Sequence, residues 1–340
     1  MIDLSVRRGE FTSLDCITAT YGHVLVTLGY DPSVLGADWG YHPVELPESE
    51  WPVERFAFHR RSFEKTLLDW YGINSELIQH QDTNAVEKYL RERLGRNEPV
   101  IVLVDAFHLP HSSNYHLQHH AHRIVVHSDE GPEFAIIDRY RGSLFEGVIG
   151  APELLSAMSS EALAEGRRGD PDWRNRTICV SSGSPGDRPS YATSAHAAIV
   201  QNTEPAATLS GTTALRTCAG QLRAAPEAYA TLSPAGMIEV SAWFGELASQ
   251  RALNARFLRA AVAAGVPGLT EGADAADDLS RHWERTRNYF FLRFRTGVSA
   301  VLRISDLLEE AAALEADWNE SIRKAMHGAS ADVSPGKSGQ

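Results

Sequence analysis

The chain has 340 residues, of which 43% are hydrophobic and 22% charged, the composition of a globular protein with room for two domains. Its formal net charge of −12 argues against a nucleic-acid partner, because concentrated Lys and Arg are needed to neutralise phosphates. The sequence contains neither the apolar core of a signal peptide nor a run of about 18 apolar residues, so we expect a cytoplasmic protein without membrane contact.

The first predicted element is a helix within residues 11–30, whose apolar residues keep helical spacing as far as Gly29, a plausible C′ residue. With Ser13 or Asp15 as its cap, Cys16 falls in the first turn. The free N–H groups of a first turn favour a thiolate and can hold a developing oxyanion. Cys16 is therefore a candidate nucleophile, with a small buried hydrophobe as the alternative interpretation.

The other two cysteines, Cys179 and Cys218, lie far from Cys16 in the sequence. Three cysteines at such spacings exclude a disulfide framework and a CxxC-type zinc site. Cys179 falls in a strand-like stretch and Cys218 in an Ala-rich helix, so we expect both in the core.

Residues 31–58 are rich in proline and aromatic residues and predict loops. The elements expected after them are a helix over 59–71, a strand over 74–80, an amphipathic helix over 84–94 and a strand over 99–105. The last, PVIVLVD, is an unbroken β-branched run typical of a central strand buried on both faces. Helices followed by a group of strands predict an α+β domain.

A hairpin is predicted from strands over 122–127 and 134–139, joined by a three-residue loop that ends at Gly131. In this register His122 lies directly opposite Asp138, with Cβ atoms roughly 5 Å apart. A carboxylate at that distance can orient an imidazole. A one-residue change of register would place the two side chains on opposite faces.

Seven of the 14 histidines lie between His108 and His127, which leaves alternatives open. His119 and His120 are alternative bases if the strand begins later than residue 122. A zinc site is a second alternative, with four candidate ligands: His116, His119, His120 and His122. No HExxH helix is present, and the segment has little helical character where i, i+4 ligands would be needed, so we expect no metal.

The rest of the chain predicts a helix over 153–165, a strand over 176–181 and then a largely helical region. The Ser-, Gly- and Pro-rich stretch SGSPGDRPS separates the two parts. We expect an α+β domain over 1–182, a linker over 183–193, a helical domain over 194–328 and a disordered tail over 329–340. The helices of the second domain are expected at about 212–231, 238–264, 274–295 and 304–326.

Nine arginines lie between Arg251 and Arg303 in this acidic chain. Arg256 and Arg259 are three residues apart on a predicted helix and are candidates for docking an acidic partner or binding a phosphate. The alternative is a solvated helix face paired with nearby Asp and Glu.

Three stretches taken together resemble the N-terminal domain of the butirosin biosynthesis protein H family: LDCITATYGHVL, PVIVLVDAFHLPHSSNYH and the hairpin HAHRIVV…FAIIDRY. The resemblance covers about residues 14–182, and the helical remainder resembles the C-terminal domain that often accompanies it. It implies a papain-like, cysteine-peptidase-like fold. It also implies acyl transfer from the phosphopantetheine thioester of an acyl carrier protein to a small-molecule amine, with no cofactor of its own.

Carried over by position, the resemblance implies that Cys16 is the nucleophile, His122 the general base and acid, and Asp138 the group that fixes the imidazole tautomer. Related peptidases place a Gln before the nucleophile as an oxyanion donor, and residues 1–15 contain none. The oxyanion is then assigned to the Cys16 backbone N–H.

Additional oxyanion and substrate contacts are expected from Ser13 or Thr12 and from the loop at Asn114 and Tyr115. Two other functions remain open. One is a cysteine hydrolase of the same fold, acting as a peptidase, amidase, thioesterase or cyclase. The other is a non-catalytic binding protein that has kept the fold.

Overall fold

The structure is a computed structural model that describes residues 16–39, 41–43, 51, 56–58, 63–140, 143–164, 172–181, 189–293 and 297–331. The chain divides into two compact units. The first contains Met1–Pro32 and Ser62–Arg188, and the second contains Ser33–Arg61 and Pro189–Gln340. The predicted α+β class is confirmed, with an antiparallel sheet in the N-terminal part and a helical C-terminal region. The segment Ser33–Arg61 groups with the helices.

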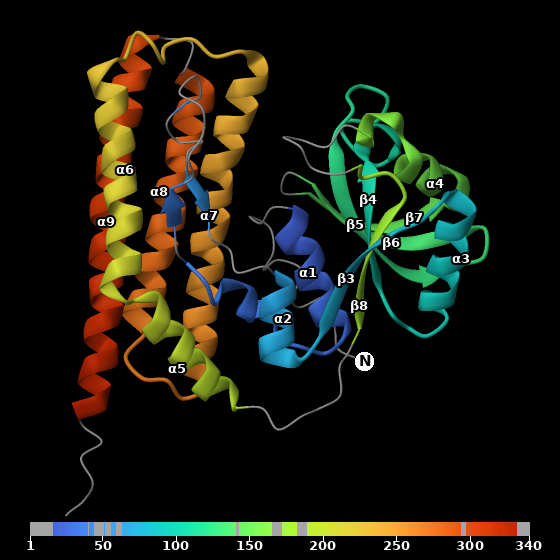
Figure 1. The fold of residues 1–340 in the computed structure, drawn as a ribbon, viewed down its shortest axis with the longest axis horizontal. Coiled ribbons are helices and arrows are strands. Elements are labelled where there is room, and N and C mark those ends of the chain that lie inside the picture. The colour runs from blue at the N-terminus through green and yellow to red at the C-terminus, as the bar shows by residue number, and fades with distance from the viewer. Residues whose placement is uncertain are drawn as a thin grey trace, which may run out of the picture. The chain divides into compact units, whose positions relative to one another are not determined.

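The first unit is built on a six-stranded sheet in the order β3-β8-β4-β5-β6-β7, in which every pairing is antiparallel (Figure 1). Its strands are β3 (Asn74–Gln79), β4 (Val100–Asp105), β5 (Ala121–Asp129), β6 (Glu133–Tyr140), β7 (Ser143–Gly150) and β8 (Arg176–Ser181). Every residue of β4 is buried, as its continuous apolar run predicts. Strand β7 has no counterpart among the sequence-based predictions.

Among the residues described, four α-helices accompany this sheet: α1 (Cys16–Thr27), α2 (Phe63–Tyr71), α3 (Thr83–Leu94) and α4 (Ala151–Ser159). Short 3₁₀ helices lie at η4 (Ala106–His108) and η5 (Glu161–Leu163). Helices α3 and α4 bury their apolar faces with alternate residues of β4 in one core, and α1 lies against β5 and β6. As predicted, Gly29 is the C′ residue of α1, and its φ of 82° closes a Schellman motif: the Gly29 N–H bonds to Val26 O and the Tyr30 N–H to Leu25 O.

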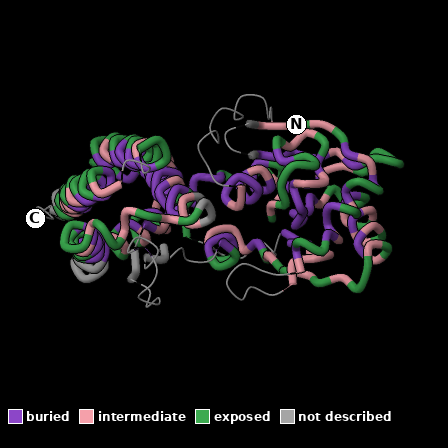
Figure 2. Tube along the Cα trace, turned by 90° about the horizontal axis from the view of Figure 1, so that it is seen from above, coloured by how far each residue is buried: buried purple, intermediate pink, exposed green. Residues whose placement is uncertain are grey.

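The second unit is mainly helical and is stabilised by an apolar core between its long helices. Its elements are η2 (Pro32–Gly36), β1 (Tyr41–Pro43), β2 (Phe56–Phe58), α5 (Tyr191–Asn202), α6 (Pro205–Ala224), α7 (Pro234–Ala263), α8 (Thr270–Arg293) and α9 (Val298–Ala331). Figure 2 shows buried residues on the inner faces of the long helices and exposed residues outside. Within the described ranges, no helix has the length and apolarity to cross a membrane.

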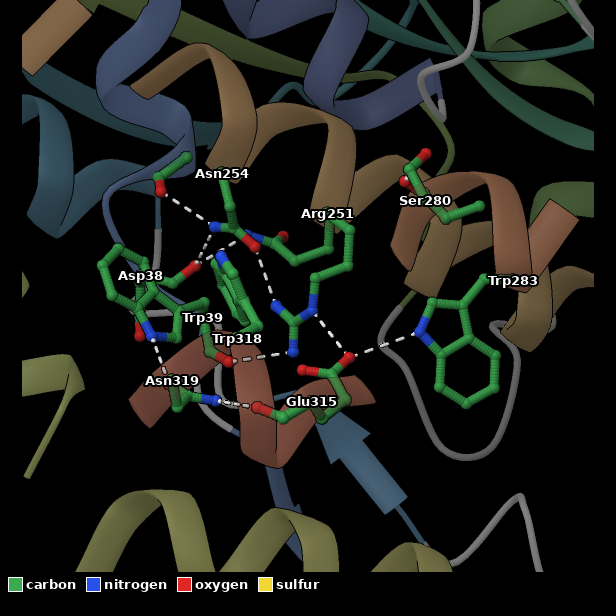
Figure 3. Close-up of polar contacts among 12 residues, drawn as sticks. Asp38, Trp39, Arg251, Asn254, Ser280, Trp283, Glu315, Trp318 and Asn319 are labelled. Atoms are coloured by element: carbon green, nitrogen blue, oxygen red, sulfur yellow. Dashed lines mark hydrogen bonds and ion pairs between the residues drawn. The ribbon is translucent and has the colours of Figure 1, made fainter. Parts of the chain in front are cut away.

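A buried polar cluster ties the segment Gly36–Trp39 to the long helices (Figure 3). The guanidinium of Arg251 donates to Glu315 at 2.8 Å, to Asn254 Oδ1 at 2.7 Å and to the Trp39 carbonyl at 3.3 Å. Asn254 in turn donates to the Gly36 carbonyl at 2.9 Å. Side chains of α7 thus replace the water that these carbonyls would otherwise bind, which explains why the segment groups with the helices.

Candidate active site

The register of the β5–β6 hairpin differs from the predicted one. Ser128 pairs with Ala135 rather than with Pro132, and a β-bulge lies between Val126 and Ser128. Beyond the bulge Val126 pairs with Ile136, so Asp138 is opposite Ile124 when the register is continued. The directly opposed His122–Asp138 pairing is therefore wrong. The cause is a turn that lies further along the chain, in which the Glu130 N–H bonds to the Glu133 carbonyl, combined with the extra residue of the bulge.

His122 and Asp138 nevertheless meet, on the diagonal of the hairpin rather than straight across it. The His122 Nε2 lies 2.5 Å from Asp138 Oδ1, and each side chain is 1% exposed. An ionised carboxylate only accepts hydrogen bonds, so Nε2 carries the proton and donates it. Cys16 also lies close enough to His122 to affect the pKa of the imidazole. The structure thus brings Cys16, His122 and Asp138 together.

The two buried groups shift each other's titration strongly. Burial alone would lower the pKa of His122, but its hydrogen bond to Asp138 and its interaction with Cys16 outweigh burial and raise that pKa from 6.5 to about 10. Burial would raise the pKa of Asp138, but hydrogen bonds from His111 and His122 lower it from 3.8 to about 2. At neutral pH the pair is therefore an imidazolium beside a carboxylate, and the positive ring faces the sulfur of Cys16.

Cys16 itself is the first residue of α1, and its side chain is partly exposed. A nucleophile must be reachable, and a first-turn residue lies beside N–H groups that have no partner within the helix. Ser13, Thr12 and the proposed cap Asp15 lie outside the described residues. Cys179 and Cys218 are both buried, which fits the expectation that they are core residues.

A second histidine, His111, also contacts Asp138. Its Nε2 lies 2.7 Å from Asp138 Oδ2, and its ring stacks on Phe145 with centroids 4.0 Å apart. His111 lies in the loop after η4, where no periodicity predicts a partner 27 residues later in the chain. The only sequence signal is its membership of the histidine-rich stretch.

The alternative base His119 belongs to a different pair. Its Nδ1 lies 2.6 Å from Asp105 Oδ2 at the end of β4, and the same carboxylate accepts from Ser160 Oγ at 2.7 Å and from the His120 N–H at 3.0 Å. Asp105 is fully buried, whereas His119 is half exposed. This carboxylate closes the base of the loop between η4 and β5, which carries His111.

The four histidines of the zinc alternative make different contacts, although the ring centroids of His120 and His122 lie 6.5 Å apart. His122 bonds to Asp138, His119 bonds to Asp105, and His116 stacks on Tyr115 with centroids 4.0 Å apart. Across the part of the chain that the structure describes, no three His, Cys, Asp or Glu side chains are grouped so that they could hold a metal.

The predicted substrate-binding residues fall into two groups. Asn114 is buried and Tyr115 is 40% exposed, both in the loop between η4 and β5. Arg259 forms ion pairs with Asp274 and Asp277 of α8 at 2.8 and 2.6 Å, and it lies on α7 with Arg256. Pairing with carboxylates of the neighbouring helix matches the alternative interpretation of Arg259, and carrier docking by Arg256 and Arg259 stays a prediction.

Comparison with known proteins finds one family. Residues 32–139 match the family model described as butirosin biosynthesis protein H, N-terminal. The search of curated proteins finds no match. The matched region contains His111, His122 and Asp138, and Cys16 lies upstream of it. The resemblance inferred from the sequence is thus confirmed for residues 32–139, where this chain is similar to the N-terminal domain of butirosin biosynthesis protein H.

Proposed function

We propose that this protein is a cysteine-dependent acyltransferase. It takes an acyl or aminoacyl group from a carrier-protein thioester onto Cys16 and transfers it to a small-molecule amine, forming an amide in natural-product biosynthesis. The observation that carries the proposal is the buried, hydrogen-bonded Asp138–His122 pair next to a cysteine at a helix N-terminus. The similarity of residues 32–139 to a biosynthetic family supports it.

The first half-reaction forms the acyl-enzyme. The Cys16 thiolate attacks the thioester carbonyl, and the negative oxygen of the tetrahedral intermediate accepts from N–H groups at the start of α1. The carbon–sulfur bond to pantetheine then breaks, and the His122 imidazolium protonates the departing thiolate. The result is a thioester on Cys16, a free pantetheine thiol and a neutral His122.

The second half-reaction transfers the acyl group. The acceptor amine attacks the Cys16 thioester, and His122 takes the proton that the nitrogen loses. The carbon–sulfur bond to Cys16 breaks, which yields the amide and restores the thiolate beside an imidazolium. Thioester exchange is nearly neutral in free energy and amide formation from a thioester is downhill, so no ATP, metal or resident cofactor is required. Phosphopantetheine arrives on the partner.

The acyl-enzyme is tested by intact-mass spectrometry after the full chain is mixed with acyl-loaded carrier proteins. We expect a mass increment equal to the acyl group in the wild type, none in Cys16→Ala, and an undiminished increment in the matched control Cys218→Ala. The absence of an increment in the wild type with every carrier would refute the proposal.

The fate of the acyl-enzyme separates transfer from hydrolysis. Added amines should discharge it as amides faster than buffer alone discharges it as free acid. Release to water that amines do not accelerate would make the protein a hydrolase of the same fold. Binding of carriers without any acyl-enzyme would make it a non-catalytic binding protein.

A further inference from the structure

We propose that His111 is a positioning residue for Asp138, holding this carboxylate so that one oxygen stays directed at His122. The inference rests on the proposed role of Cys16, His122 and Asp138. It adds a fourth side chain, which acts through Asp138 and touches neither the cysteine nor the acyl group.

The two oxygens of Asp138 are divided between two histidines. Oδ1 accepts from His122 at 2.5 Å, and Oδ2 accepts from His111 at 2.7 Å. A carboxylate with only one hydrogen-bond partner can rotate about its Cβ–Cγ bond. This rotation would weaken the hydrogen bond to that partner. Asp138 is 1% exposed, so water has little access to replace a lost partner. A second donor therefore fixes the plane of the carboxylate and also gives its second oxygen a hydrogen-bond partner.

His111 is itself held in place from two directions. Its ring lies nearly parallel to Phe145, with an angle of 5° between the planes, and its side chain is 11% exposed. Phe145 is the partner of Asp138 in the β6–β7 pairing, so the stacking platform and the carboxylate are adjacent on neighbouring strands. The loop that carries His111 is closed at its base by Asp105 and by the bond from the Ala106 N–H to the His120 carbonyl.

This arrangement gives His111 a chemical task without proton transfer. Since the carboxylate only accepts, His111 donates its Nε2–H and Asp138 stays ionised. An ionised, immobile Asp138 keeps the proton of His122 on Nε2 and stabilises the imidazolium that faces Cys16. Loss of His111 should therefore weaken the activation of Cys16 while leaving the acyl-binding surface intact.

The test measures the rate at which iodoacetamide alkylates Cys16, followed by peptide mass spectrometry on the full chain. We expect His111→Phe, which keeps an aromatic ring over Phe145 but has no donor, to slow alkylation about tenfold. His111→Gln, which offers an amide N–H, should recover most of the rate. Circular dichroism shows whether each variant is folded. If His111→Phe perturbs the loop, His111→Gln still tests the inference.

His119→Phe is the discriminating control, because it breaks the other histidine–aspartate pair in the same loop. An unchanged rate in this variant supports a specific action of His111 on Asp138, whereas a loss equal to that of His111→Phe would assign the effect to loop anchoring and overturn the inference. The inference would also be overturned if His111→Phe alkylated at the wild-type rate while His122→Ala alkylated slowly.

The outcomes separate this inference from the proposed function. If His111→Phe slows alkylation but no carrier-bound acyl group is transferred, the positioning role stands and the acyltransferase fails. If acyl transfer proceeds and His111→Phe alkylates at the wild-type rate, the positioning role fails alone. A wild-type Cys16 whose alkylation rate is insensitive to His122→Ala overturns both.

Discussion

His122 on β5 and Asp138 on β6 share one face of the sheet because the turn and the bulge together change the register of the hairpin by an even number of residues. The turn moves the partner of Ser128 three positions beyond the predicted Pro132 to Ala135, an odd shift that alone would turn the two side chains to opposite faces. The bulge after Val126 removes one position from this shift. The remaining shift of two keeps the faces and converts an opposed pair into a diagonal one.

Deletion of His127, the residue in the bulge, is expected to leave Cys16 reactive. In the shortened strand Val126 is joined directly to Ser128, so the pairs Ser128–Ala135 and Val126–Ile136 can both be kept and His122 stays on the face of Asp138. His127→Ala, which keeps the residue count and the bulge, is the matched control, and both variants should alkylate within about twofold of the wild-type rate. A folded deletion variant that alkylates as slowly as His122→Ala would contradict this pairing.

Asp138→Asn is expected to slow acyl transfer by roughly 10³-fold, because an amide neither stabilises the imidazolium nor fixes the tautomer of His122. The pKa of His122, followed by NMR, should fall from its raised value. Asp129→Asn is the control: this carboxylate lies in the same hairpin and forms a partly exposed ion pair with Arg91. It should change the transfer rate less than about twofold, and equal losses in the two variants would exclude a specific role for Asp138.

The titration of the buried pair predicts how stability depends on pH. The pKa of His122 is raised to about 10, so its contribution is fully present below pH 6.5 and is lost as pH rises through 10. The pKa of Asp138 is lowered to about 2, so its contribution is present above pH 3.8 and is lost as pH falls through 2. The pair stabilises the fold most between these limits.

Urea unfolding of the wild type and of His122→Gln tests this dependence. The difference in free energy of unfolding should be largest near pH 6 and shrink by pH 9.5. His80 gives a control of opposite sign, because burial lowers its pKa and its neutral form is favoured in the fold. The stability lost in His80→Gln should therefore be smaller below pH 6 than above it. A pH-independent difference for His122→Gln would show that its imidazolium is not favoured by folding.

Elements with one dominant pattern could be predicted from the sequence. Strand β8 was expected over 176–181 and occupies Arg176–Ser181, and the unbroken apolar run of β4 gave both its type and its burial. Strand β7 was not predicted, because it is an edge strand whose Val148 is 50% exposed and whose Gly147 and Gly150 interrupt the alternation. An edge strand with one covered face lacks the signal that prediction needs.

The candidate site was partly predictable for a similar reason. Cys16 was predictable from its position in the first turn of a helix, and the His122–Asp138 pair from the alternation of side chains along two strands. A register change of an even number of residues leaves both side chains on the same face. The contact of His111 with Asp138 depends on a loop conformation, which no periodicity encodes. Likewise, the grouping of Gly36–Trp39 with the helices depends on Arg251 and Asn254, more than 200 residues later in the chain.

The packing of Gly36 against α7 gives a prediction with an internal control. A Cβ built at Gly36 would lie 2.1 Å from the Leu253 carbonyl oxygen, and backbone atoms cannot move aside as a flexible side chain can. Gly36→Ala should lower the free energy of unfolding by about 2–4 kcal/mol. Gly220 lies inside α6 with no atom within 4 Å of its built Cβ, so Gly220→Ala should raise stability by up to about 1 kcal/mol through helix propensity. Thermal unfolding of both variants measures the contrast. A Gly36→Ala protein as stable as the wild type would mean that the segment does not pack on α7 at this distance.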